Sequence, residues 1–198
     1  MTGAPTSPLL TTSYCPPDRR PALVEDTIGG ALLVATAQCK DAVALIDGQP
    51  DPAARRSWSF VQMEEEAHRV AYALLQHFEP GQHVAVWSSN RPEWVMLEFG
   101  AALAGLVLVT VNPAYLAQEL THVLRQSKAA GVIVEDVYRG RDLLQVLQSV
   151  RGELPDLRTI VPLSTSTLAG TLPFLSVMPS STIRRSASMT TGSTASRW

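Results

Sequence analysis

The fold is decided by residues 81–115, GQHVAVWSSNRPEWVMLEFGAALAGLVLVTVNPAY. Residues 83–88, HVAVWS, predict a strand, because valine and tryptophan favour extended backbone. A helix is expected from Pro92 to Ala104, since proline in the first turn loses no helical hydrogen bond. Residues 106–111, LVLVTV, predict a strand covered on both faces. A strand, a helix and a strand with short connections indicate a βαβ unit and a parallel sheet.

The same alternation continues on both sides of this stretch. Upstream, Thr27 can cap a helix over 28–38 that places Ile28, Leu32 and Ala35 on one face. Ser59 and Gln62 have the spacing of a capping box that opens a helix to about residue 77. The remaining expected elements are strands at 42–47, 56–59, 131–135 and 158–161 and helices at 116–127 and 139–150. The sequence therefore predicts an α/β fold with a doubly wound, mostly parallel sheet and helices on both faces.

Ligands of such folds bind beyond the carboxyl ends of the strands, which are here 88–90, 112–115 and 135–136. Glu135 and Asp136 are adjacent there and point to opposite faces, which suits solvation and capping better than joint acid–base catalysis. G-x-G-x-x-G, G-x-S-x-G and G-x-x-x-x-G-K-[ST] do not occur in the sequence. These absences argue against a nicotinamide enzyme, a nucleophile-elbow hydrolase and a P-loop protein.

Composition sets further limits. The 198 residues are 45% hydrophobic with a net charge of −2, which excludes wholesale disorder and offers no basic field for nucleic acid. The two cysteines are too few for a disulfide scaffold, and Cys39 is expected to be a buried thiol. The four histidines show no metal-ligand spacing. The most apolar stretch, 94–111, contains Glu98, so no membrane span and no secretory signal are expected, and the predicted location is cytoplasmic.

Charge is distributed unevenly along the chain. All 18 acidic residues precede position 164, and residues 164–198 contain three arginines and 16 serines and threonines. This break predicts three parts: an extended lead-in at 1–26, the α/β region at 27–163 and an irregular Ser/Thr-rich tail at 164–198.

Three segments taken in order carry a family resemblance: 58–75 (WSFVQMEEEAHRVAYALL), 81–115 and 119–134 (ELTHVLRQSKAAGVIV). Residues 26–163 resemble the N-terminal part of an acyl-CoA synthetase of the AMP-forming adenylate superfamily. VNPAY at 111–115 resembles the fatty-acid–CoA ligases in particular. The resemblance implies part of the N-terminal subdomain of the adenylate-forming fold. It also implies a fatty acid, ATP, Mg and CoA as the substrates and cofactors of the full-length family.

In that family a loop of the type Y-T-S-G-T-T-G-x-P-K-G holds the pyrophosphate portion of ATP. Thr190, Thr191, Gly192, Ser193 and Thr194 partly match it and are the candidate nucleotide-binding residues. The match departs where Ala195, Arg197 and Trp198 replace the glycine, proline and lysine that are usual. No catalytic residue and no metal ligand is assigned.

The resemblance therefore implies a truncated, inactive ligase region that binds none of these cofactors tightly. Exposed sheet and helix faces of such a region would favour self-association. Two alternatives stay open: a non-catalytic α/β binding or interaction module, and a degenerate gene product whose tail follows a frameshift.

Overall fold

The computed structural model describes residues 24–163 of the chain. The elements in chain order are α1 (Ile28–Cys39), β1 (Val43–Ile46), η1 (Pro52–Ala54), β2 (Ser57–Ser59), α2 (Phe60–Leu75), β3 (His83–Trp87), α3 (Pro92–Leu103), β4 (Val107–Val111), α4 (Ala117–Gln126), β5 (Gly131–Val134), β6 (Val137–Tyr138), β7 (Arg141–Asp142), α5 (Leu143–Val150), η2 (Arg151–Glu153) and β8 (Thr159–Pro162). The α/β prediction is confirmed, and most expected elements lie within a few residues of their observed bounds.

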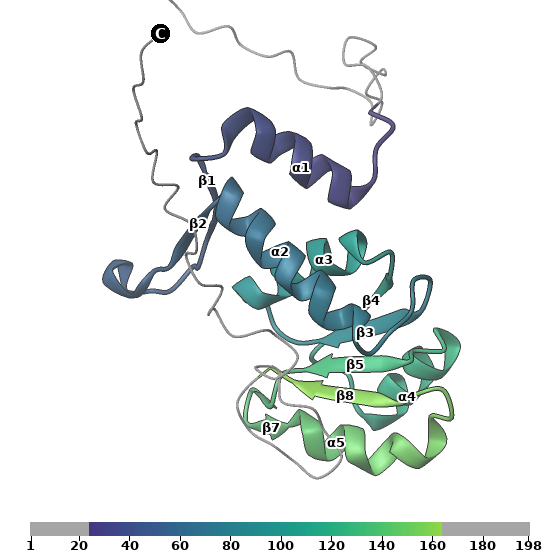
Figure 1. Cartoon of the computed structure of the whole chain (residues 1–198). Coiled ribbons are helices and arrows are strands. Elements are labelled where there is room, and N and C mark those ends of the chain that lie inside the picture. Colours follow the sequence, from purple (N-terminus) through teal and green to yellow (C-terminus); the bar gives the residue numbers. More distant parts are fainter. Residues whose placement is uncertain (1–23, 164–198) are drawn as a thin grey trace, which may run out of the picture.

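The central sheet has four parallel strands in the order β4-β3-β5-β8 (Figure 1). β3 lies inside it, with Val84 opposite Leu108 of β4 on one side and opposite Gly131 of β5 on the other. The chain first moves outward from β3 to β4 and then crosses back to β5. The strand order therefore reverses between β3 and β5, which is where doubly wound sheets bind ligands.

Helices cover both faces of the sheet, as predicted. Side chains of β3 alternate between two hydrophobic clusters: Val84 and Val86 belong to one, and Ala85 and Trp87 to the other. The first cluster includes buried residues of α1, α2 and α3, and the second includes buried residues of α4 and α5. In Figure 1, α1 lies on the outer side of α2 and α3.

The predicted capping box opens α2. The Ser59 hydroxyl accepts a hydrogen bond from the Gln62 backbone nitrogen (3.4 Å), and the Gln62 side-chain oxygen accepts one from the Ser59 backbone nitrogen (2.9 Å). Each residue thereby satisfies a backbone donor that the first helical turn leaves unpaired. The bonds fix the point where the β1–β2 hairpin ends and α2 begins.

The strand expected at 106–111 is found, but its two faces are covered only in part. Leu108 packs against the first hydrophobic cluster and Val109 and Val111 against the second. β4 lies at the edge of the sheet, where Thr110 is exposed and 44% of Val107 is exposed. All four residues of β5 are buried instead. A continuous apolar run specifies a strand but not its place in the sheet, because the same residues suit a central strand and a partly covered edge.

The expected helix over 139–150 begins later, at Leu143. The preceding residues form a two-stranded hairpin, β6–β7, in which Arg139 (φ 50°) and Gly140 (φ 79°) make the turn. Two successive positive φ angles are typical of the tight turn that matches strand twist. Asp142 then caps α5, since its carboxylate accepts a hydrogen bond from the Gln145 backbone nitrogen (2.8 Å).

Thr27 caps α1 as predicted, but the expected apolar face and the expected buried thiol are not found as such. Leu32 is buried as expected, yet the other buried residues of α1 are Gly29 and Thr36, and 57% of Ile28 is exposed. Cys39 is a free, exposed thiol and not a buried one. The reason is that α1 approaches α3 closely at Gly29, where an added Cβ would lie 2.9 Å from Leu103 Cδ2. This contact turns the Gly29 side of the helix inward.

Within residues 24–163, no helix is long and apolar enough to cross a membrane. The predicted tail at 164–198, and all but the last three residues of the predicted lead-in at 1–26, lie outside the described residues.

Candidate functional site

The three predicted ligand-facing segments meet at the carboxyl edge of the sheet. Ser88–Asn90 follows β3, Asn112–Tyr115 follows β4 and Glu135–Asp136 follows β5. The Trp87 indole nitrogen donates to the Asn112 carbonyl (2.9 Å) and joins the ends of β3 and β4. Arg141 Nη2 donates to the Pro113 carbonyl (2.8 Å) and fixes the loop after β4. The edge is therefore ordered by hydrogen bonds between segments that are distant in sequence.

Glu135 links the loops that follow β3 and β5, the two adjacent strands between which the strand order reverses. Its carboxylate accepts a hydrogen bond from the Ser89 backbone nitrogen (2.8 Å) and another from the Ser89 hydroxyl (3.0 Å). The Ser88 side chain beneath is buried, and its hydroxyl donates to the Ser89 carbonyl (3.0 Å). The prediction that Glu135 serves capping is confirmed, because it satisfies two donors of the neighbouring loop.

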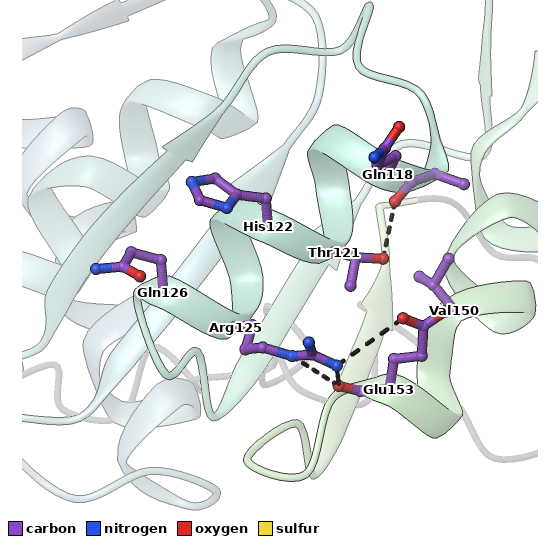
Figure 2. Close-up of a pocket in the computed structure, with 8 residues that line it drawn as sticks. Gln118, Thr121, His122, Arg125, Gln126, Val150 and Glu153 are labelled. Atoms are coloured by element: carbon purple, nitrogen blue, oxygen red, sulfur yellow. Dashed lines mark hydrogen bonds and ion pairs between the residues drawn. The ribbon is translucent and has the colours of Figure 1, made fainter.

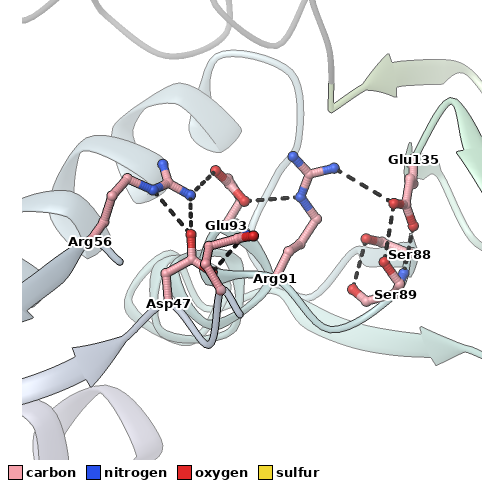
Figure 3. A network of polar contacts seen from close by, with 8 residues as sticks. Asp47, Arg56, Ser88, Ser89, Arg91, Glu93 and Glu135 are labelled. Carbon is pink, nitrogen blue, oxygen red and sulfur yellow. Dashed lines mark hydrogen bonds and ion pairs between the residues drawn. The ribbon is translucent and has the colours of Figure 1, made fainter. Parts of the chain in front are cut away.

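A line of alternating charges extends from Glu135 to the β1–β2 hairpin (Figure 3). Arg91 Nη1 lies 4.0 Å from the Glu135 carboxylate, and Arg91 Nε donates to Glu93 (2.9 Å). Arg56 Nη2 lies 3.5 Å from Glu93 and 3.0 Å from the Asp47 carboxylate. Asp47 is buried at the end of β1. The line therefore ties the hairpin to the first turn of α3 and to the end of β5.

The charges of this network shift two pKa values. The hydrogen bond to Asp47, opposed by desolvation and helped by the charges of Glu93 and Asp47, raises the pKa of Arg56. Burial raises the pKa of Glu93, but the hydrogen bond from Arg91 and the charges of Arg91 and Arg56 outweigh burial and leave it below its ordinary value. Both shifts favour the charged forms of Arg56 and Glu93.

A cleft of about 400 Å³ lies beside this network, between the end of β1 and the start of α3. Apolar side chains of Leu45, Ile46 and Val95 line it together with Asn90 and Arg91. Arg91 and Arg56 are both bound by carboxylates, and Glu135 is bound by Ser89. These contacts therefore order the loops at the edge of the sheet, and the charged side chains of the network bind one another.

A larger groove, about 530 Å³, lies between α4 and the α5–η2 segment (Figure 2). Arg125 crosses it, with Nη2 2.8 Å from the Glu153 carbonyl and 3.8 Å from the Glu153 carboxylate. The Thr121 hydroxyl is bound within α4, where it donates to the Ala117 carbonyl (2.8 Å). All its lining residues belong to α4, α5 or η2, so the groove belongs to the outer helical layer and not to the carboxyl ends of the strands.

The candidate nucleotide-binding residues, Thr190, Thr191, Gly192, Ser193 and Thr194, lie outside the described residues. Between residues 24 and 163, no group of three or more His, Cys, Asp or Glu side chains could hold a metal ion. The described region therefore offers no set of three such ligands for magnesium.

Sequence reasoning missed Asp47, Arg56, Arg91 and Glu93 as a network. Asp47 ends a strand, and Arg56 stands before the strand that pairs with it, so their contact follows from the antiparallel register of β1 and β2. That register could have been inferred from the two short strands expected at 42–47 and 56–59, because the short loop between them favours a hairpin. The contact between Arg56 and Glu93 spans 37 positions and depends on how the hairpin packs on α3.

The comparisons with known proteins agree on one family. The model of the family described as "AMP-binding enzyme" matches residues 33–182. The Bacillus subtilis (strain 168) protein named "Putative acyl-CoA synthetase YngI" is 35% identical over 137 residues, covering 69% of this chain and 24% of its own length. The medium-chain acyl-CoA ligase ACSF2, mitochondrial, of Rattus norvegicus is 33% identical over 128 residues, covering 58% and 21%.

A solved structure agrees with the sequence relatives. The anthranilate CoA ligase AuaEII, in complex with anthranoyl-AMP, superposes with a TM-score of 0.66 at 27% identity, covering 77% of this chain and 28% of that one. The chain thus spans about a quarter of the length of the curated relatives it matches. The family model covers well over half of the chain and accounts for the whole parallel sheet. This chain belongs to the AMP-binding enzyme family.

Proposed function

We propose that this chain contributes the N-terminal α/β region of an AMP-forming fatty-acid–CoA ligase. The observation that carries the proposal is the family match over residues 33–182, supported by 35% and 33% identity to an acyl-CoA synthetase and a medium-chain acyl-CoA ligase. The names of these two relatives favour an acyl chain as the acid substrate. A cytoplasmic location is part of the same proposal.

The proposed reaction has two steps. A carboxylate oxygen of the fatty acid attacks the α-phosphorus of ATP, which forms an acyl-adenylate and releases pyrophosphate. The thiol of CoA then attacks the acyl carbon, which forms the thioester and releases AMP. Such phosphoryl and acyl transfers need positioned cations and hydrogen-bond donors around the developing charge.

The chain alone is proposed to be inactive. Support comes from its coverage, since it spans 24% and 21% of the two relatives. Further support comes from the network beside the carboxyl edge of the sheet, in which Arg91 and Arg56 of the β1–β2 hairpin are bound by carboxylates of the same chain. The proposed role of the described region is therefore to form one side of a larger catalytic unit.

Binding of ATP to the chain is expected to be weak. The proposed phosphate contacts are the neutral donors of Thr190, Thr191, Gly192, Ser193 and Thr194. Each such hydrogen bond contributes about 0.5–1.5 kcal/mol net, so three contribute about 1.5–4.5 kcal/mol. A millimolar Kd already corresponds to about 4.1 kcal/mol. Ordering these residues around ATP costs part of that gain, so we expect a Kd of about 1 mM or weaker.

The test is an AMP-release assay with Mg-ATP, CoA and saturated fatty acids of different lengths. A full-length acyl-CoA ligase under the same conditions is the positive control. The expected result is no AMP above the no-enzyme background with any acid. Turnover that depends on both the acid and CoA would contradict the proposed inactivity.

A second measurement separates the remaining alternatives. A ligand that binds only the native state raises the midpoint of thermal unfolding. A rise with a non-hydrolysable acyl-adenylate analogue, but not with AMP alone, would support a ligase-derived binding region. No rise with any adenylate would favour the degenerate gene product, and a rise with unrelated small molecules only would favour a different binding module.

A further inference from the structure

β4 is an edge strand with a regular backbone. Its five residues, Val107–Val111, pair with β3 from His83↔Val107 to Trp87↔Val111 without a register shift. Among the described residues, β3 is its only strand partner. One side of β4 therefore presents a straight row of backbone groups to its surroundings.

The direction of these groups follows from strand geometry. The Val107 backbone nitrogen donates to the Gln82 carbonyl (2.9 Å), on the side of β3. Because backbone groups alternate sides along a strand, the N–H and C=O groups of Leu108 and Thr110 point away from β3. Thr110 is exposed and 44% of Val107 is exposed, so this edge is accessible within the described structure.

β4 also lacks the features that protect edge strands. Natural edges commonly carry a charged residue, a proline or a bulge. β8, at the other edge of the sheet, ends in Pro162, which has no N–H to donate. β4 has none of these features, and residues 99–118 around it contain no Asp, Glu, Lys or Arg.

We propose that two copies of this chain associate through antiparallel pairing of their β4 strands. The absence of charge over 99–118 argues for a second copy, because two identical uncharged edges meet without like-charge repulsion. An isologous two-fold contact uses the same patch on both chains and closes after two copies. The pairing satisfies the outward groups of Leu108 and Thr110 and joins the two sheets into one of eight strands.

The test begins with the molar mass of the full-length chain by light scattering. At about 100 µM, well above a micromolar Kd, the expected mass is twice the 21.4 kDa of one chain. In the register that pairs Leu108 with Thr110 of the second copy, Thr110→Lys brings the two new lysines to diagonally neighbouring positions. Val107→Lys places a lysine opposite Val111 of the second copy. Each charge at the paired edge should weaken association by about tenfold or more. Val137→Lys is the matched control, because 55% of Val137 is exposed on the separate β6–β7 hairpin.

Hydrogen exchange identifies the surface independently of the mass. The amides of Leu108 and Thr110 should exchange more slowly as protein concentration rises, and this dependence should disappear in Val107→Lys. Far-UV circular dichroism identifies a variant that fails to fold, and Thr110→Lys then carries the test.

Three results would overturn the proposal. One is a monomer at about 100 µM, where a micromolar dimer would be complete. Another is a dimer that persists unchanged in both lysine variants. A third is open-ended growth beyond two copies. If concentration-independent protection of Leu108 and Thr110 accompanies a monomer, another segment of the same chain covers the edge. None of these results bears on ligase activity, so the test is independent of the proposed function.

Discussion

The carboxylate of Glu135 binds both the backbone nitrogen (2.8 Å) and the hydroxyl (3.0 Å) of Ser89, across 46 positions of sequence. The contact joins the ends of β5 and β3, between which the strand order reverses. Open α/β sheets usually bind ligands in that crevice. Here the chain's own side chains bridge it, so the loop after β3 is fixed by an internal carboxylate.

Removal of this carboxylate should destabilise the fold. Glu135→Ala leaves the half-buried Ser89 N–H without its acceptor, at a cost of about 1–3 kcal/mol in the free energy of unfolding. Glu135→Gln keeps an acceptor oxygen and should cost less. Urea unfolding monitored by circular dichroism measures both effects.

The matched control for this prediction is Glu153→Ala. Glu153 and Arg125 are both exposed, and the backbone carbonyl that binds Arg125 remains in the variant. An exposed ion pair contributes only about 0–1 kcal/mol. Equal losses in Glu135→Ala and Glu153→Ala would show that the bridge between β5 and β3 adds nothing.

At Gly100, where α3 packs on α2, the structure leaves no room for a larger side chain. A Cβ at Gly100 would lie 2.4 Å from Val70 Cγ1 and 3.1 Å from the Ala67 carbonyl. Overpacking of this kind costs about 1–3 kcal/mol, which exceeds the gain of at most about 1 kcal/mol in helix propensity. Gly100→Ala should therefore lower the midpoint of urea unfolding.

Two variants check that the Gly100 effect is steric. Gly48→Ala, with no atom within 4 Å of the added Cβ, should change stability by less than about 0.5 kcal/mol. In a Val70→Gly background, where both clashing carbons (Cγ1 at 2.4 Å and Cβ at 2.6 Å) are absent, Gly100→Ala should cost clearly less than in the wild type. An undiminished cost in that background would refute the steric explanation.

Acid should weaken the network around Glu93. The folded-state pKa of Glu93 lies below its ordinary value of 4.5, so the unfolded state binds more protons between the two values. The stabilisation is complete above about pH 4.5 and is lost as the pH falls through the folded-state pKa. Unfolding midpoints of the wild type and Glu93→Gln should differ most at near-neutral pH and converge in acid. A constant difference would contradict the assignment.

Residues 27–163 should behave as one protease-resistant domain. The prediction rests on the charge break at residue 164 and on the two hydrophobic clusters, which span the described sheet. Brief digestion with a low-specificity protease should leave a core of roughly 15 kDa, at ~110 Da per residue. Mass spectrometry of the product locates its ends. Early cuts distributed through the sheet would contradict the domain assignment.

Much of the fold was predictable because its determinants are local. The Ser59–Gln62 capping box, Pro92 in the first turn of α3 and the valine-rich strands each act within a few residues. The place of a strand in the sheet is not local. The run at 106–111 predicted a strand covered on both faces, yet β4 lies at an edge where Val107 and Thr110 are exposed. The neighbours of a strand are decided by chain crossovers and not by its own residues.

The candidate site was predictable only in part. Parallel topology alone brings Ser88–Asn90, Asn112–Tyr115 and Glu135–Asp136 to one edge, and this expectation is confirmed. The salt bridge from Arg56 to Glu93 was not foreseen, since it depends on how the β1–β2 hairpin packs against α3. The phosphate-loop residues Thr190–Thr194 lie outside the described residues, and their role stays a prediction.

The central proposal is that this chain contributes one side of an AMP-forming acyl-CoA ligase and does not form a complete nucleotide site by itself. Isothermal titration calorimetry of the purified full-length chain with Mg-ATP tests it most directly. We expect heats that fit a Kd of about 1 mM or weaker, or no binding heat at all. A micromolar Kd with one site per chain would contradict the proposal.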